Sequence, residues 1–207
     1  MAKTRAEQKE TKSKLPISPE YASKFQELKT GEQLMLRDNE SAAKARVQIR
    51  AKECDVYYAR PDGEIIPEVR GVRRADYVIY CCSKHQVSFI EMKGQNIQLS
   101  EDKSPHAQIL STLEYFSNDE GLKNLVSSRV EKHAFIVSAL RQRIPSGISI
   151  SERKLLYRLG AGNQKSDDAR EYLHYVRYIQ KGRYSDKDGH IVCSSEKPLE
   201  FPYEQND

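Results

Sequence analysis

The stretch ADYVIYCCSKHQVSFIEMKG, residues 75–94, decides the fold that this sequence predicts. Two apolar runs rich in β-branched and aromatic residues, 75–82 and 87–94, are separated by a short polar segment. Runs of this kind around a polar turn are typical of a β-hairpin. We therefore expect two adjacent strands, with two carboxylates and an ammonium group at one edge: Asp76 opens the first run, and Glu91 and Lys93 end the second.

The spacing of these charged residues suggests a particular chemistry. Side chains in a strand alternate between faces, so Glu91 and Lys93 are expected on one side and Met92 on the other. Half-buried charges are costly unless they are paired or bind an ion. Mg²⁺ usually takes one or two protein carboxylates together with phosphate oxygens of a substrate. The hypothesis is a divalent metal held by Asp76 and Glu91, with Lys93 holding or activating water; the alternative is a solvated charged cluster on an edge strand.

These residues resemble the signature of the PD-(D/E)XK nuclease superfamily, the restriction-endonuclease-like proteins. The resemblance rests on Asp76, on Glu91-Met92-Lys93 fifteen positions later, and on a helix opening at Ser104-Pro105. It covers roughly residues 17–140. One departure is Ala75, where the superfamily's name has a proline.

The resemblance implies an α/β fold with an α-β-β-β-α-β core, in which helices flank a mixed central sheet. It further implies that Asp76 and Glu91 bind Mg²⁺ or Mn²⁺, often with the backbone carbonyl of Met92, and that Lys93 assists the water nucleophile. In that family the first helix sometimes adds a carboxylate, here Glu32 with Glu27 as its rival.

The helix after the motif also has a counterpart in the resembled family, where it often presents a glutamine towards the catalytic site. Gln108 is therefore a candidate support residue, and a helix-surface glutamine is the alternative. The helix is expected to pack on the sheet through its apolar residues, Ile109, Leu110, Leu113 and Phe116. A second stripe is expected to turn outward and consists of Gln108, Thr112 and Tyr115.

The remaining elements are expected from periodicity and turn residues. They are a helix from Ser18-Pro19 to about Arg37 with Tyr21, Phe25 and Leu28 on one face, a strand over 54–59, a turn at 60–63, a short helix over 122–126, a strand over 133–139, a helical segment over 152–159, an aromatic run over 172–179 and a hairpin turn at 186–189.

Length and composition predict one domain of 207 residues with mean hydropathy −0.76. Residues 1–16 are polar and are expected to form a flexible arm. The nuclease domain is expected over 17–207, with its core at 17–140 and a C-terminal extension at 141–207. No run approaches the ~20 apolar residues of a membrane span, and no signal peptide is recognisable, so a cytoplasmic protein without a membrane partner is expected.

The charge balance favours a nucleic-acid partner. The net charge is only +4, but Arg73 and Arg74 stand just before Asp76, and basic residues alternate with tyrosines over 172–184. Such residues can neutralise phosphates and stack on bases. The alternative is that these charges keep the protein in solution and the tyrosines pack in the core.

Other chemistries find little support. The four cysteines have no C-x-x-C spacing, which predicts reduced packing residues and no zinc site. The glycine-rich segment 160–166 lacks the spacing of a phosphate-binding loop. The resemblance implies a Mg²⁺- or Mn²⁺-dependent deoxyribonuclease, in particular an endonuclease, and this is the expected function. The alternative is a non-catalytic nucleic-acid-binding or assembly subunit on the same fold, with protein partners or in a homo-oligomer.

Overall fold

The computed structural model describes residues 15–38, 46–68, 74–93, 104–138, 173–178, 191–193 and 198–204. The elements in these ranges, in chain order, are α1 (Pro19–Ala22), β1 (Gln26–Leu28), β2 (Gln33–Arg37), β3 (Arg46–Ala51), β4 (Val56–Ala59), the irregular turn η1 (Pro61–Ile65), β5 (Tyr77–Cys81), β6 (Gln86–Lys93), α2 (Pro105–Asn118), the 3₁₀ turn η3 (Lys123–Val126), β7 (Glu131–Ser138), β8 (Leu173–Tyr178), β9 (Ile191–Cys193) and β10 (Leu199–Phe201).

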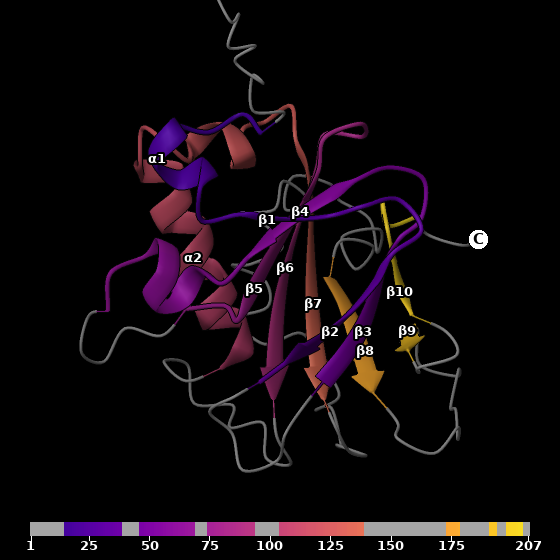
Figure 1. The fold of residues 1–207 in the computed structure, drawn as a ribbon. Coiled ribbons are helices and arrows are strands. Elements are labelled where there is room, and N and C mark those ends of the chain that lie inside the picture. The colour runs from indigo at the N-terminus through magenta and orange to yellow at the C-terminus, as the bar shows by residue number, and fades with distance from the viewer. Residues whose placement is uncertain are drawn as a thin grey trace, which may run out of the picture.

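The described strands form two sheets. The larger sheet has the order β1-β4-β5-β6-β7-β8-β9, and the smaller sheet has the order β10-β3-β2. In the larger sheet, the neighbours β1, β4, β5 and β6 pair antiparallel, whereas the neighbours β6, β7, β8 and β9 pair parallel. Figure 1 shows β6, β7 and β8 pointing the same way, so that their carboxyl ends lie at one edge. The expected α/β fold with a mixed sheet is thus confirmed.

The larger sheet is covered on both faces. Val78 and Tyr80 belong to a core cluster that also contains residues of α2, and Tyr77 and Ile79 belong to a second cluster with residues of β3 and β10. All five residues of β5 are therefore buried, although their side chains alternate between faces. Burial on both faces explains why this strand reads as a continuous apolar run.

Helix α2 begins where the sequence predicts. The Ser104 side chain accepts a hydrogen bond from the backbone N–H of Ala107 at 3.1 Å, and Pro105 occupies the first turn. Ile109, Leu113 and Phe116 pack into the core, as expected from their spacing. Phe116 meets Phe89 of β6 edge-to-face, with ring centroids 5.9 Å apart, which fixes the helix on the sheet.

The expected helix over residues 18–37 is wrong. Only α1, Pro19–Ala22, is helical, and the rest of the range forms β1 and β2. Gly31 adopts a left-handed φ of 87°, which turns the chain between the two strands and is accessible to glycine at little cost. Phe25 and Leu28, which share a helical spacing, are buried on opposite faces of the larger sheet. Tertiary packing has overridden a short apolar periodicity.

Other predicted elements agree with the described ranges. The strand over 54–59 corresponds to β4, the strand over 133–139 to β7, the short helix over 122–126 to η3, and the aromatic run over 172–179 contains β8. The smaller sheet was not predicted. Leu15, placed in the expected flexible arm, is buried in the core with 6% exposure, whereas residues 1–14 lie outside the described residues. The segments 152–159 and 186–189 also lie outside them.

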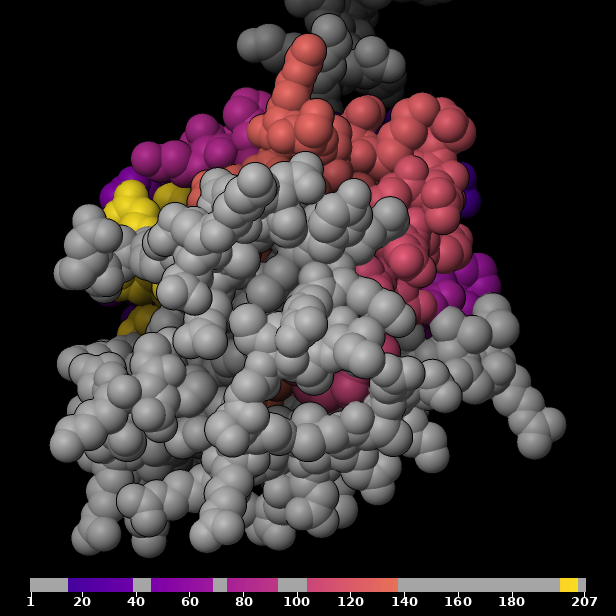
Figure 2. All heavy atoms as spheres, turned by 180° about the vertical axis from the view of Figure 1, so that it is seen from behind, coloured from indigo at the N-terminus to yellow at the C-terminus, as the bar shows by residue number. Residues whose placement is uncertain are grey.

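Segments distant in sequence cover different sides of the molecule. Seen from behind in Figure 2, α2 and the residues after it lie at one side and the C-terminal residues around β10 at the other. A hydrogen bond from the backbone N–H of Tyr203 to the Gln86 side chain, 2.6 Å long, ties the C-terminal segment to β6. None of the helices in the described ranges is long and apolar enough to span a membrane.

Three of the cysteines in the described ranges, Cys54, Cys81 and Cys82, are free thiols. The sulfur atoms of Cys54 and Cys81 lie 2.7 Å apart, and burial raises the pKa of the Cys54 thiol to about 11. Cys81 is buried in the core, whereas Cys54 and Cys82 are half-buried. The side chain of Cys193 lies outside the described part of the chain.

Candidate active site

The hairpin of β5 and β6 brings Asp76 and Glu91 together. Its register pairs Val78 with Phe89 and Tyr77 with Ile90, and the same register continued by one position would bring Asp76 opposite Glu91. The Asp76 carboxylate accepts a hydrogen bond from the backbone N–H of Met92 at 2.5 Å, so Asp76 lies against the end of β6. Cβ atoms of directly opposed residues in an antiparallel pair are roughly 5 Å apart. The juxtaposition of these two carboxylates stays a prediction, which the register of the hairpin supports.

The two carboxylates share the face of the sheet that α2 covers. Val78 and Phe89 lie in the core cluster on that face, and alternation carries Asp76 and Glu91 to the same side. Met92 belongs to the cluster on the opposite face, as its position between Glu91 and Lys93 predicts.

Burial determines how strongly the Asp76 and Glu91 carboxylates interact with each other. Glu91 is 1% exposed and Asp76 is half-buried. Two like charges on opposed residues repel each other, and low solvent access strengthens the repulsion. A cation or a proton at this position would relieve it. The alternative of a solvated surface cluster is therefore wrong for Glu91.

Lys93 is the last residue of β6. Its backbone is in parallel register with Ser138 at the end of β7, two positions along the strand from Glu91. The Lys93 side chain lies outside the described part of the chain, so its predicted role remains a prediction.

Helix α2 anchors the residues that lead into Asp76. The backbone N–H of Ala75 donates to the Thr112 hydroxyl at 2.8 Å, and that hydroxyl donates to the Gln108 carbonyl at 2.9 Å. The Gln108 side chain donates to the Arg74 carbonyl at 3.3 Å. Three buried polar groups thus satisfy one another and fix the start of β5.

The outward stripe predicted for Gln108 and Thr112 is wrong, because both face the start of β5. Gln108 is 7% exposed and Thr112 is fully buried. The helix-surface alternative for Gln108 is therefore excluded, and its contact with Arg74 gives it a supporting position. The sequence signal for Thr112 is its place one helical turn after Gln108.

Arg74 also lies against α2. Its guanidinium donates to the Ser111 hydroxyl and stands over the Tyr115 ring, with 5.8 Å from the guanidinium carbon to the ring centroid. These contacts hold the Arg74 side chain against α2, and the hydrogen bond to Ser111 uses one of its guanidinium N–H groups. Arg73 lies outside the described residues.

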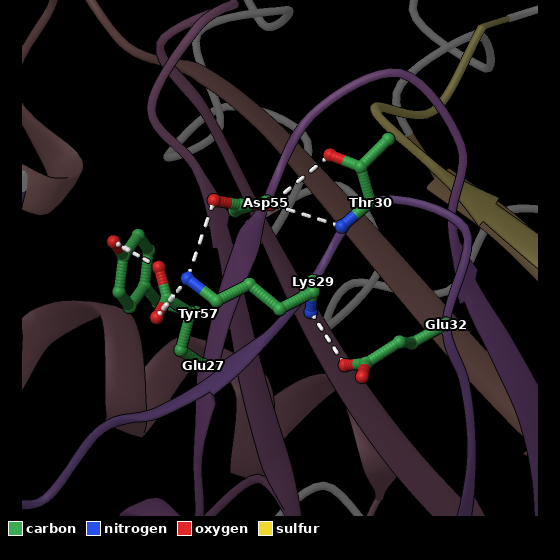
Figure 3. A network of polar contacts seen from close by, with 6 residues as sticks. All are labelled: Glu27, Lys29, Thr30, Glu32, Asp55 and Tyr57. Atoms are coloured by element: carbon green, nitrogen blue, oxygen red, sulfur yellow. Dashed lines mark hydrogen bonds and ion pairs between the residues drawn. The ribbon is translucent and has the colours of Figure 1, made fainter.

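The two rival third carboxylates lie elsewhere. Figure 3 shows Glu27 and Glu32 in a polar network with Lys29, Asp55 and Tyr57. Glu27 accepts from the Tyr57 hydroxyl at 2.8 Å, and Glu32 accepts from the Lys29 backbone N–H at 2.8 Å.

The register shows how far this network is from Asp76. Glu27 pairs with Tyr57, which pairs with Tyr80, four positions along β5 from Asp76. Four positions along a strand span about 13 Å. Neither glutamate joins the Asp76–Glu91 pair, and neither lies on a helix as predicted.

A buried histidine near the start of α2 was not predicted from the sequence. His106 is 5% exposed, and burial lowers the pKa of its imidazole to about 4. A neutral imidazole at this position avoids adding charge to the first turn of the helix. Nothing in the local sequence distinguishes this histidine from the other four.

Asp76 and Glu91 are the residues of this site that could hold a hard divalent cation. Among the described residues, no group of three or more His, Cys, Asp and Glu side chains is arranged to hold a metal. Two carboxylates are nevertheless the number that Mg²⁺ commonly takes from a protein when phosphate oxygens and water complete its shell.

Comparisons of the chain with protein-family models, curated proteins and solved structures found no match.

Proposed function

We propose that this protein is a metal-dependent nuclease of the PD-(D/E)XK type that hydrolyses phosphodiester bonds in DNA. The observation that carries the proposal is the hydrogen bond from the Met92 N–H to the Asp76 carboxylate, which holds Asp76 against the end of β6 between Glu91 and Lys93. These are the residues that the resemblance assigns to metal binding and water activation.

The order of elements supports the same proposal. Strands β4, β5 and β6 pair antiparallel in succession, α2 follows, and β7 pairs parallel to β6. This order supports the proposal because the core that the resemblance implies contains the same β-β-β-α-β succession. The helix expected before it is represented by the four residues of α1, with β1, β2 and β3 between α1 and β4.

The candidate site residues have distinct roles in the proposed reaction. Asp76 and Glu91 would hold Mg²⁺ or Mn²⁺, with the Met92 carbonyl as a further ligand by resemblance. The bound ion would polarise the phosphodiester and lower the pKa of a coordinated water. Lys93 would orient the attacking water through its ammonium group. The contacts of Gln108 and Thr112 keep the Asp76 segment fixed against α2.

A second candidate function is a non-catalytic nucleic-acid-binding or assembly subunit. The observation that favours it is the near-complete burial of Glu91, because a carboxylate must be reachable from solvent to exchange a metal and a substrate. Such a subunit would bind nucleic acid without a requirement for a divalent ion.

Cleavage assays separate the two functions. Supercoiled, linear and single-stranded DNA are incubated with the full chain in Mg²⁺, in Mn²⁺ and in EDTA. The nuclease proposal predicts cleavage only with a divalent ion, and loss of cleavage in Asp76→Asn, Glu91→Gln and Lys93→Ala. Because residues of one catalytic unit are strongly non-additive, each single variant is expected to lose nearly as much as the triple variant.

The matched control for this assay is Glu32→Gln, a carboxylate in the network of Figure 3 that lies apart from the site. It should cleave at the parent rate. Parent protein that binds DNA but leaves all three substrates intact in both metals would favour the binding subunit instead.

A further inference from the structure

Two thiols meet on the face of the larger sheet that β3 and β10 cover. Cys81 is the last residue of β5, and Cys54 lies half-buried in the connection between β3 and β4. Cys81 belongs to the core cluster of that face, and Cys54 packs against it. Their sulfur atoms are 2.7 Å apart, and neither cysteine is in a disulfide bond. Because a disulfide bond is about 2.05 Å long, small movements of the two side chains suffice to form one.

The connection that bears Cys54 is held in place on both sides. Two residues earlier, the backbone N–H of Lys52 donates to the Phe201 carbonyl at 2.7 Å. Directly after it, the Asp55 carboxylate accepts from the backbone N–H of Thr30 at 2.9 Å and from the Thr30 hydroxyl at 3.0 Å, as Figure 3 shows. Strand β5 is fixed between β4 and β6. The fold therefore holds the two thiols in contact, which gives each a high effective concentration towards the other.

The surroundings of Cys54 determine how fast this pair reacts. Cys54 is the thiol that a small oxidant can reach, since Cys81 is only 1% exposed. Burial and the hydrogen bond with Cys81 raise the pKa of the Cys54 thiol to about 11, while hydrogen bonds from Ser83 act in the opposite direction. The thiol is therefore protonated at neutral pH and reacts slowly. The extent of oxidation at equilibrium depends instead on the reduction potential of the pair against that of its surroundings.

We propose that Cys54 and Cys81 form a reversible disulfide bond when the chain meets a low-molecular-weight disulfide such as glutathione disulfide. The Cys54 thiolate attacks one sulfur of the oxidant and releases one glutathione thiolate. Cys81, on loss of its proton, attacks the Cys54 sulfur and releases the second glutathione thiolate. The two protein thiols thus give two electrons and two protons to the oxidant, which is reduced to two thiols. The inference does not depend on the proposed nuclease function.

The disulfide would close a loop of the chain that carries the candidate site. Cys54 and Cys81 are 27 residues apart in sequence, and β4, η1 and Asp76 lie between them. Closing a loop of this length restricts the unfolded chain and thereby stabilises the folded one. The oxidised protein is therefore expected to melt roughly 5–10 °C higher than the reduced protein.

Thiol counting under native conditions tests the inference. The full chain is reduced, freed of reductant, incubated with glutathione disulfide until its thiol content is constant, and alkylated for mass spectrometry. The parent should lose two of its four thiols without retaining glutathione. Trypsin should then release residues 53–70 linked to residues 75–84, and dithiothreitol should remove this link.

The matched control is Cys82→Ser. Cys82 is next to Cys81 in sequence but packs against the core cluster on the α2 face, so the variant should form the same cross-link as the parent. Since Cys81 and Cys82 share one tryptic peptide, a cross-link in this variant also assigns the bond to Cys81. Cys54→Ser should form no link between the two peptides, and dithiothreitol should leave its melting temperature unchanged.

The outcomes that contradict the inference are distinct. Four remaining thiols in the oxidised parent, glutathione that stays attached to Cys54, loss of the link in Cys82→Ser, or a link from residues 53–70 to Cys193 would overturn it. A cross-linked chain that melts no higher than the reduced chain would overturn the predicted gain in stability. The decisive cross-link is measured in proteins that retain both Cys54 and Cys81, so the result does not depend on whether a Cys81 variant folds.

Discussion

The Asp76 carboxylate accepts a hydrogen bond from the backbone N–H of Met92 at 2.5 Å, across the open end of the β5–β6 hairpin. This contact joins the first candidate metal ligand to the strand that bears the second. It also gives Asp76 a structural role, because its carboxylate accepts a backbone N–H at the open end of the hairpin. Substitutions at Asp76 therefore affect both stability and the proposed chemistry.

The first prediction separates these two parts of Asp76. Asp76→Ala removes the acceptor and leaves the Met92 N–H without it, which should lower the free energy of unfolding by about 1–2 kcal/mol. Asp76→Asn keeps an oxygen acceptor and removes the repulsion with Glu91, so it should unfold at an equal or higher urea concentration than the parent. Both variants should lose cleavage. Equal stability of Asp76→Ala and Asp76→Asn would show that the Met92 contact does not contribute.

The second prediction concerns the buried hydroxyl of Thr112, which accepts from Ala75 and donates to Gln108. Thr112→Val keeps the shape but leaves the Ala75 N–H unsatisfied, and urea denaturation should show a loss of about 1–3 kcal/mol. Cleavage should also fall, because Asp76 directly follows Ala75, whose backbone would lose its hydrogen bond to α2.

Thr112→Ser is the matched control for this prediction, since it retains the hydroxyl and removes one methyl group. It should cost about 1 kcal/mol or less and keep most of the cleavage rate. If Thr112→Ser and Thr112→Val behaved alike in both assays, packing of the methyl group and not the hydrogen bonds would explain the position.

The third prediction is a pH dependence that originates at His106. Burial lowers the pKa of this imidazole to about 4, below the ordinary value near 6.5 of an unfolded chain. As the pH falls from about 6.5 to 4, the unfolded state binds a proton that the folded state excludes, so the folded state loses stability. The loss at pH 4 relative to pH 7 should reach about 3 kcal/mol.

His106→Gln removes the titration and isolates this contribution. Denaturation is measured for parent and variant at several pH values, and the difference in unfolding free energy should change in favour of the variant between pH 6.5 and pH 4. Groups common to both proteins, such as the Glu131 carboxyl whose pKa the hydrogen bond from His133 lowers, cancel in the comparison. Parallel pH curves would contradict a lowered imidazole pKa.

The hairpin could be predicted from the sequence because its signal is local. Asp76 and Glu91 flank two apolar runs with one short turn between them, and period-two alternation settles which residues share a face. Ser104-Pro105 is likewise a local signal for the start of a helix, and α2 begins there.

Elements whose contacts are distant in sequence could not be predicted in this way. Tyr21, Phe25 and Leu28 have an apolar spacing that fits a helix, but β1 pairs with β4 and β2 pairs with β3, which only the tertiary arrangement determines. Strand β10 pairs with β3 from about 150 residues away. The role of Thr112 also depends on such packing, since it stands in no motif.

The measurement that tests the central claim most directly is the effect of Mg²⁺ on the melting temperature of the parent and of the Asp76→Asn, Glu91→Gln protein. An ion that binds only the folded state at ~100 times its Kd stabilises it by roughly 2.7 kcal/mol. The account predicts that Mg²⁺ raises the melting temperature of the parent and leaves that of the double variant unchanged, and that the variant without metal is at least as stable as the parent without metal. Equal shifts with Mg²⁺ in the two proteins would contradict a metal site formed by Asp76 and Glu91.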